Sequence, residues 1–265
     1  MSWLQAIVLA VVQGLTEFLP ISSSGHLVLV PAVFGWTDQG LVFDVAVHFG
    51  SLAAVCFYFR NDLAGLIRGG VKLLGGSSES PESRMALYIM IGTVPAAIAG
   101  LLFAGWIEAN LRDPVIIVYT LSGYGVLMAL ADRLGKHQRV IANVRLRDAL
   151  IIGIVQALSL VPGTSRSGVT ISAAMMLGFQ RLDAARFSFL LSAPVILLAS
   201  GYEALVLLVD GTQIAWSQLA IGASISAVVA YLSIDFFMRF VNAIGLLPFV
   251  IYRLGLAGVV FYALV

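Results

Sequence analysis

Long apolar stretches separated by short polar segments dominate the pattern of this chain. Six of them are long enough to cross a bilayer as helices, which takes about 20 mainly apolar residues. They cover residues 41–59, 85–106, 114–131, 187–209, 216–237 and 244–265. We therefore predict six transmembrane helices in an all-α polytopic membrane protein.

Two further apolar regions, 3–36 and 147–178, are interrupted near their middles by Pro, Ser and Gly. Pro20 and Pro162 lack the N–H that a continuing helix needs, so each marks a helix break. A broken helix at membrane depth is tolerated only where protein buries it or where it lines a watery cavity. We therefore expect each region to form a re-entrant helical hairpin, which brings the prediction to about ten helices.

The composition agrees with a membrane protein. Of 265 residues, 60% are hydrophobic and 11% are charged, whereas soluble domains carry about 25% charged residues. The net charge of +1, without a basic stripe, argues against a nucleic-acid partner. The partner that the composition indicates is the bilayer itself.

Lysine and arginine gather between the predicted helices. Twelve of the fifteen lie in loops 60–84, 132–148 and 179–186 or at Arg239, and the predicted topology puts all twelve on one side. The positive-inside rule makes that side cytoplasmic. Only Arg112 lies on the other side. Residues 69–84 are rich in Gly and Ser and are expected to be flexible.

The same topology divides the chain into two similar halves. Residues 1–131 hold the hairpin 3–36 and three spans, and residues 147–265 hold the hairpin 147–178 and three spans. Residues 132–148 form a basic cytoplasmic linker. Because three is odd, the halves have opposite orientations. We therefore predict an inverted repeat, whose site lies near the midplane where the broken helices meet.

The second hairpin carries the residues of an anion site. A helix N-terminus offers unpaired N–H groups and a partial positive charge, which suit phosphate. Arg166 adds a planar charge that can bind phosphate oxygens in two places. A polar helix cap alone needs no such charge. The candidate phosphate-binding residues are Gly163, Thr164, Ser165, Arg166, Ser167, Gly168 and Thr170, together with Gln13, Ser22 and Ser24 of the first hairpin.

The first hairpin carries acid–base chemistry. Gln13 and Glu17 are four residues apart, so they share one helical face. The break that follows holds Ser22, Ser23 and Ser24, and then His26. A carboxylate and an imidazole beside hydroxyls can serve as base, orienting group and nucleophile. The alternative is a polar helix cap with a histidine that reaches toward water.

Asp44 and His48 form a third polar pair, at positions i and i+4 of span 41–59. Both residue types bind metals. Two residues are too few for a metal site, and a supporting or interfacial role is the favoured interpretation.

The two hairpin motifs together resemble one family. Residues 13–26 read Gln-Gly-Leu-Thr-Glu-Phe-Leu-Pro-Ile-Ser-Ser-Ser-Gly-His, and residues 162–170 read Pro-Gly-Thr-Ser-Arg-Ser-Gly-Val-Thr. Both are similar to motifs of the bacterial undecaprenyl-diphosphatase family, also called bacitracin-resistance proteins. Residues 43–51 and 247–253 look similar too, so the resemblance covers essentially the whole chain.

The resemblance implies a bacterial plasma-membrane enzyme with a site open to the periplasmic side. Such enzymes convert C55 polyprenyl diphosphate to the monophosphate carrier lipid of peptidoglycan synthesis. The family's essential Glu, His and Arg fall on Glu17, His26 and Arg166, and its motif hydroxyls on Ser23, Ser165 and Thr170. Members are commonly stimulated by Mg²⁺ or Ca²⁺. Here Gln13 replaces one of two carboxylates that many members have, so Glu17 is the candidate ligand of a loosely bound cation.

Several alternatives stay open from the sequence. The nucleophile is Ser23, through a phosphoseryl intermediate, or a water molecule. In either case Arg166 holds the diphosphate, and Glu17 with His26 takes the proton. A transporter or flippase for a polyprenyl phosphate has the same architecture, although the base beside serines favours chemistry. A homodimer is neither required nor excluded.

Overall fold

The computed structural model describes residues 1–76, 80–111, 113–209 and 215–264, and these are almost entirely helical. The helices that precede the linker are α1 (Trp3–Thr16), α2 (Ser23–Phe34), α3 (Leu41–Tyr58), α4 (Arg60–Leu74), α5 (Pro81–Asn110) and α6 (Pro114–Leu134). The helices that follow it are α7 (Leu146–Ala157), α8 (Arg166–Met176), α9 (Arg181–Val209), α10 (Trp216–Ile244) and α11 (Leu247–Leu264). Short 3₁₀ turns lie at Ile141–Asn143 and Leu158–Leu160.

The all-α polytopic prediction is confirmed. Five helices are long and apolar enough to cross a membrane, namely α3, α5, α6, α9 and α10. The sixth predicted span corresponds to α11, whose described apolar part, Leu247–Tyr262, is shorter. Both predicted hairpins are pairs of short helices separated by a break, α1 with α2 and α7 with α8.

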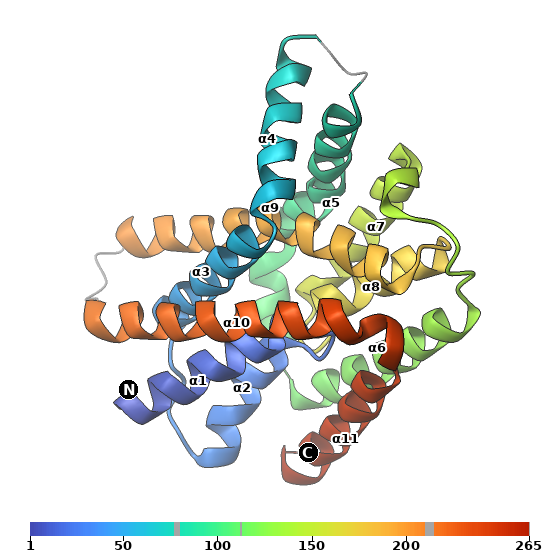
Figure 1. Cartoon of the computed structure of the whole chain (residues 1–265). Coiled ribbons are helices and arrows are strands. Elements are labelled where there is room, and N and C mark those ends of the chain that lie inside the picture. The colour runs from blue at the N-terminus through green and yellow to red at the C-terminus, as the bar shows by residue number, and fades with distance from the viewer. Residues whose placement is uncertain (77–79, 112, 210–214, 265) are drawn as a thin grey trace.

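The prediction of a loop over residues 60–84 is wrong, because residues 60–74 form helix α4. Figure 1 shows α4 beside the start of α5, away from the rest of the molecule. Leu63 and Leu66, one turn apart, pack against the main core, while Arg68 and Lys72 are exposed. The helix is amphipathic. Charged residues interrupt its apolar face along the sequence, so a search for long apolar runs does not detect it. The predicted flexible segment includes residues 77–79, which lie outside the described residues, as does Arg112.

The loop predicted over 179–186 is also mostly helical, since α9 begins at Arg181, and Arg239 lies within α10. Their basic residues are paired instead of free. Arg181 Nε donates to Asp132 Oδ1 at 2.5 Å, and Arg186 pairs with Asp62. The two ion pairs join the start of α9 to α6 and to α4.

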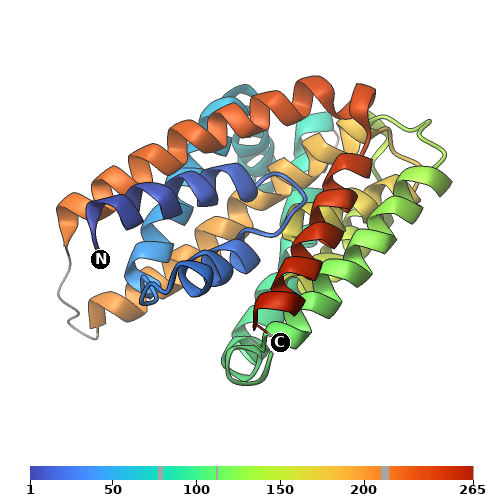
Figure 2. The ribbon, with the colours of Figure 1, turned by 90° about the horizontal axis from the view of Figure 1, so that it is seen from below.

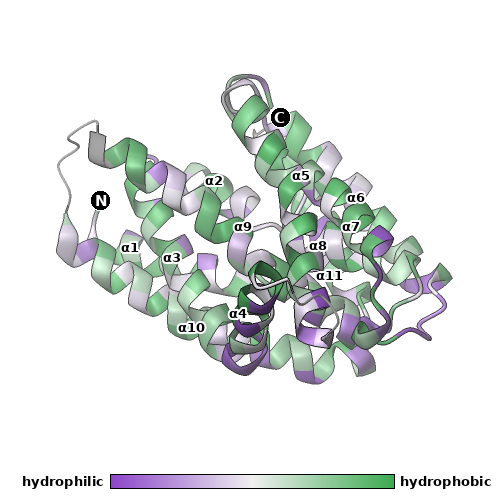
Figure 3. Ribbon diagram, turned by 90° about the horizontal axis from the view of Figure 1, so that it is seen from above, coloured by the Kyte–Doolittle hydropathy of each residue, from purple (hydrophilic) through white to green (hydrophobic). Residues whose placement is uncertain are grey.

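The helices pack in a few close pairs. α10 lies along both α1 and α3, and α11 lies along α6, as Figure 2 shows from below. In Figure 3 the long helices are mainly hydrophobic, whereas hydrophilic residues gather on α4 and in the segment that joins α6 to α7. Side chains at the helix surfaces therefore suit a hydrocarbon surrounding.

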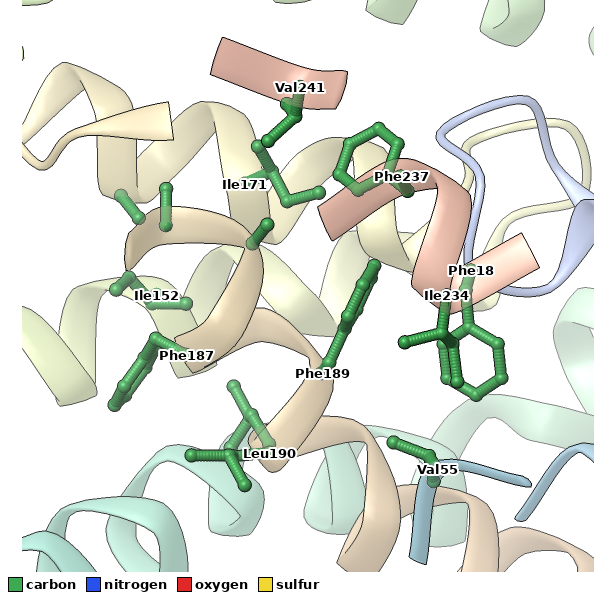
Figure 4. Packing of buried hydrophobic residues seen from close by; sticks show 14 of the residues in the cluster. Phe18, Val55, Ile152, Ile171, Phe187, Phe189, Leu190, Ile234, Phe237 and Val241 are labelled. Atoms are coloured by element: carbon green, nitrogen blue, oxygen red, sulfur yellow. The ribbon is translucent and has the colours of Figure 1, made fainter. Parts of the chain in front are cut away.

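An aromatic cluster anchors the first helix break. Phe18 is fully buried, and its ring lies 5.3 Å from that of Phe189 in an edge-to-face contact. Phe189 also contacts Phe59 and Phe237, and Figure 4 shows Phe18, Phe189 and Phe237 converging from three segments. Edge-to-face rings add about 1 kcal/mol beyond burial. The residue beside Glu17 is thus fixed in the core.

Candidate active site

Two helices begin with the same unusual local geometry. α2 begins at Ser23 and α8 at Arg166, and the preceding caps, Ser22 and Ser165, have left-handed φ angles of 75° and 72°. Each cap Oγ accepts a hydrogen bond from the backbone N–H three residues later, at 3.3 Å and 3.2 Å. Such strained non-glycine residues cluster at functional sites. The shared geometry places Ser23 and Arg166 at equivalent first helical positions.

Glu17 is the point where the two segments meet. Its Oε1 accepts a hydrogen bond from Arg166 Nη2 at 2.9 Å. Its Oε2 accepts from Ser23 Oγ at 2.7 Å and from Gln13 Nε2 at 3.0 Å. His48 Nε2 lies 3.7 Å from the same oxygen. The carboxylate is buried, yet it is paired and hydrogen-bonded, as a buried charge must be.

These groups line a cavity of about 190 Å³. Its walls are formed by Glu17, Ser22, Ser23, Ser24, His48, Ser159, Ser165, Arg166, Val195, Ile196, Ala199 and Ser200. Nine of these twelve residues are polar, in a chain that is 60% hydrophobic. Six of them were predicted from the sequence as site residues.

The cavity is suited to an anion. The caps and first residues of α2 and α8 both line it, so two positive helix ends face one space. Arg166 Nη1 is buried and makes no hydrogen bond to any residue that the structure describes. An unsatisfied buried guanidinium N–H costs free energy. A phosphate oxygen would satisfy it.

His26 does not line the cavity, and its ring is held by other groups. Nδ1 lies 2.7 Å from Ser22 O, so it carries the proton, and Nε2 lies 2.6 Å from Tyr252 Oη. The rings of His26 and Tyr252 stack 5.6 Å apart. Nδ1 therefore holds the strained Ser22 cap, and Nε2 holds the Tyr252 hydroxyl of α11. The structure thus separates His26 from the Glu17 carboxylate with which the sequence analysis had joined it.

Arg253 of α11 ties the two segments together. It is 1% exposed, and it donates to the carbonyl oxygens of Pro20 and Gly163 at 3.4 Å and 3.0 Å. It also donates to the carbonyl oxygens of Thr120 and Leu121, both at 3.2 Å. A single guanidinium therefore connects the first break, the second break and α6.

The remaining predicted residues support the walls from behind. Thr170 Oγ1 pairs with Ser188 Oγ at 2.6 Å, and Ser167 Oγ donates to Leu19 O at 3.1 Å. At Gly163, with a φ of +85°, a Cβ would lie 2.2 Å from Thr120 Oγ1. Only glycine fits there. Thr164 and Gly168 are buried beside them, and they too are absent from the cavity lining.

The side chains do not form a metal site of their own. Among the described residues, no three of His, Cys, Asp and Glu are grouped closely enough to hold an ion. Both Glu17 oxygens are already bonded to Arg166, Ser23 and Gln13. The described side chains of the cavity therefore do not by themselves fit a protein-held cation.

Sequence reasoning missed part of the site. His48 was noted but placed outside it, and its approach to Glu17 depends on how α3 packs beside α1. Ser200 is one serine within a long apolar helix, so no pattern singles it out. Tyr252 and Arg253 lie within a predicted span, and nothing in the sequence indicates which segments they reach.

Comparison with known proteins places this geometry in a family. The family model described as bacitracin resistance protein BacA matches residues 6–259. A protein of Hahella chejuensis named undecaprenyl-diphosphatase is 53% identical over 97% of both chains. Similar proteins of the same name from Nitrosococcus oceani and Teredinibacter turnerae are 50% and 48% identical over at least 99% of each chain.

Proposed function

We propose that the chain, which belongs to the bacitracin resistance protein BacA family, hydrolyses undecaprenyl diphosphate in the cavity between α2 and α8. The products are undecaprenyl phosphate and inorganic phosphate. The protein is a polytopic membrane phosphatase, and the family is associated with bacitracin resistance.

One observation carries the mechanism: Ser23 and Arg166, from two separate segments, both bond Glu17 at the cavity wall. A hydroxyl that donates to a buried carboxylate at 2.7 Å is an activated nucleophile. An anion carrier needs only donors, whereas this site also holds an acceptor for a proton. The arrangement therefore favours phosphoryl transfer over transport.

The proposed reaction has two steps. Ser23 Oγ attacks the terminal phosphorus, its proton goes toward Glu17, and the anhydride P–O bond breaks with its electron pair leaving on undecaprenyl phosphate. Water then attacks the phosphoserine and regenerates the hydroxyl. Arg166 and the N-termini of α2 and α8 stabilise the charge on the transferred phosphoryl group, which is the main demand of this chemistry.

An apolar groove beside the cavity offers a place for the lipid tail. It has a volume of about 340 Å³ and is lined by residues of α5 and α9: Ile89, Met90, Thr93, Val94, Ala97, Pro194, Leu197 and Leu198. Val195, Ile196 and Ala199, on the opposite face of the same stretch of α9, line the polar cavity. The two spaces thus share one stretch of α9. We assign the isoprenoid chain of the substrate to the groove.

The location and orientation follow from the basic residues. We place the protein in the bacterial plasma membrane, with α4, the linker after α6 and the start of α9 on the cytoplasmic side. We further propose that the cavity opens toward the periplasm, as the resemblance of the two motifs implies. Exposed Arg68, Lys72 and Arg145 support this orientation.

Phosphate release by the purified protein in detergent tests the function. Undecaprenyl diphosphate should yield one phosphate, and undecaprenyl phosphate should yield none. Arg166→Ala, purified in parallel, should be nearly inactive. Absence of release from the diphosphate under every divalent-ion condition would refute the phosphatase and favour the transporter.

A further inference from the structure

The second histidine near the site, His48, has a geometry that the reaction described above does not use. Its Nδ1 lies 2.7 Å from the carbonyl oxygen of Asp44. A carbonyl only accepts, so Nδ1 carries the ring proton and Nε2 of the neutral ring has a free lone pair. That nitrogen lies 3.7 Å from Glu17 Oε2, and His48 lines the cavity.

We infer that His48 Nε2 is the terminal acceptor of the proton released by the nucleophile, through Glu17. The inference rests on the proposed phosphatase reaction and extends it. The path runs from Ser23 Oγ to Glu17 Oε2 over 2.7 Å and from there to His48 Nε2 over 3.7 Å. All three residues line the cavity.

Glu17 alone is a poor final acceptor. It receives hydrogen bonds from Arg166, Ser23 and Gln13, and each of them stabilises the ionised carboxylate. A proton passed on to His48 leaves Glu17 charged and paired with Arg166. It also forms an imidazolium beside a carboxylate, which stabilises the imidazolium.

His48 is also able to release the proton. Its side chain is 28% exposed, whereas that of Glu17 is 7% exposed. His26, the other histidine near the site, has both ring nitrogens bonded and is absent from the cavity wall. Of the two imidazoles, that of His48 both approaches Glu17 and lines the cavity.

Several described charged groups lie near His48. Glu17 and Arg166 line the same cavity, and Asp44 lies one turn earlier on α3, where it accepts from Gln39. Glu203 lies on the turn of α9 that follows Ser200. On α10, Asp235 lies at the far end of α3, beside Tyr58.

The phosphorylation and hydrolysis steps balance with this acceptor. The Ser23 proton moves first to the ionised Glu17 carboxylate and then from Glu17 to His48 Nε2, in two successive transfers. After undecaprenyl phosphate leaves, water attacks the phosphoserine and gives one proton to Glu17, which passes it to His48 once His48 has returned its own proton. The proton on His48 returns to Ser23 Oγ as the phosphoserine bond breaks.

A pH profile of kcat/KM distinguishes a proton acceptor from a structural residue. The wild-type rate should fall on the acid side, because a protonated imidazole cannot accept. His48→Gln should lower kcat/KM about 100-fold at neutral pH, within the range for general base catalysis, and should remove or shift that acid limb. His137→Gln, in the linker away from the cavity, should leave both rate and profile unchanged.

Chemical rescue provides the second measurement. His48→Ala should regain activity in proportion to added free-base imidazole, and Ser23→Ala should not. The proposal is overturned if His48→Gln stays within threefold of wild type, or if it loses activity equally at all pH values without rescue of His48→Ala. A wild-type enzyme without phosphate release would instead refute the phosphatase itself.

Discussion

The two broken segments have nearly the same backbone geometry and opposite chemistry. Each turns through a left-handed serine into a short helix, and each cap accepts from the amide three residues on. One then presents a hydroxyl, Ser23, and the other a guanidinium, Arg166, at the same helical position. Glu17 in the first segment corresponds to Leu160 in the second. The duplicated backbone is therefore a common support, and single side chains decide what each copy contributes.

The largest effect should follow substitution of the residues that join the copies. Arg166→Ala leaves Glu17 buried without its cation and the phosphate without its clamp. We expect kcat/KM to fall about 100-fold to 1000-fold, the effect typical of a lost transition-state donor. Arg166→Lys is the control, since it keeps the charge but loses the fork. Retention of more than a tenth of kcat/KM by the alanine variant, a loss below about 1.4 kcal/mol, would contradict the clamp.

The contribution of the first broken segment can be tested separately, because Ser23 is proposed to form a covalent phosphoserine. Ser23→Ala should lose at least 100-fold in kcat and all radiolabel trapped as phosphoserine after an acid quench. Ser24→Ala removes a neighbouring hydroxyl whose contact to Ser22 spans 3.4 Å, and it should keep the label with a loss below tenfold. Full turnover by Ser23→Ala would assign the attack to water.

The hydrogen bonds by which Arg253 connects the two broken segments should affect stability as well as activity. Arg253→Met leaves four carbonyl oxygens without their donor, and we expect the free energy of unfolding to fall by about 3 kcal/mol. Arg253→Lys restores the charge and one or two bonds, and should recover part of it. Thermal unfolding in detergent measures both. Equal stability of Arg253→Met and wild type would mean that the segments hold their positions without α11.

The equivalence of the two caps can be tested by matched substitutions. Ser22→Ala and Ser165→Ala each remove one cap hydrogen bond in the same strained conformation. Each should cost about 1 kcal/mol of stability, and the two losses should agree within about 0.5 kcal/mol. Unequal losses in unfolding experiments would show that the two cap hydrogen bonds differ in strength although the two segments share a backbone conformation.

The smallest effect should be at the groove between α5 and α9. Ala97→Trp fills it and should raise KM for undecaprenyl diphosphate about threefold to tenfold, with little change for farnesyl diphosphate. Ala104→Trp, exposed on the same helix, is the matched control and should change neither. An equal rise of KM for both substrates would contradict the assignment of the isoprenoid tail to the groove.

Much of this molecule could be predicted from hydrophobic run lengths and two motifs. The six apolar stretches gave helices, and Pro20 and Pro162 marked the two breaks. The predicted i, i+4 pairing of Gln13 with Glu17 is confirmed by a 3.0 Å hydrogen bond. Local patterns set these features, so the sequence was sufficient for them.

The missing parts depend on tertiary packing. Helix α4 has an apolar face too narrow to appear as a run, and its partners lie on α5 and in the core. Which histidine approaches Glu17 is decided by the packing of α3 beside α1, a contact over 31 residues of sequence. Sequence proximity favoured His26, whereas the fold brings His48.

The buried Arg253 has a consequence for the order of assembly. It follows both broken segments in the chain and holds the carbonyl oxygens of Pro20 and Gly163. During synthesis both segments emerge and enter the membrane before this side chain exists. The pocket can therefore be completed only after α11 has docked. A nascent chain that stops short of this helix would bear every catalytic group. It would still lack the hydrogen bonds that hold the two broken segments in position.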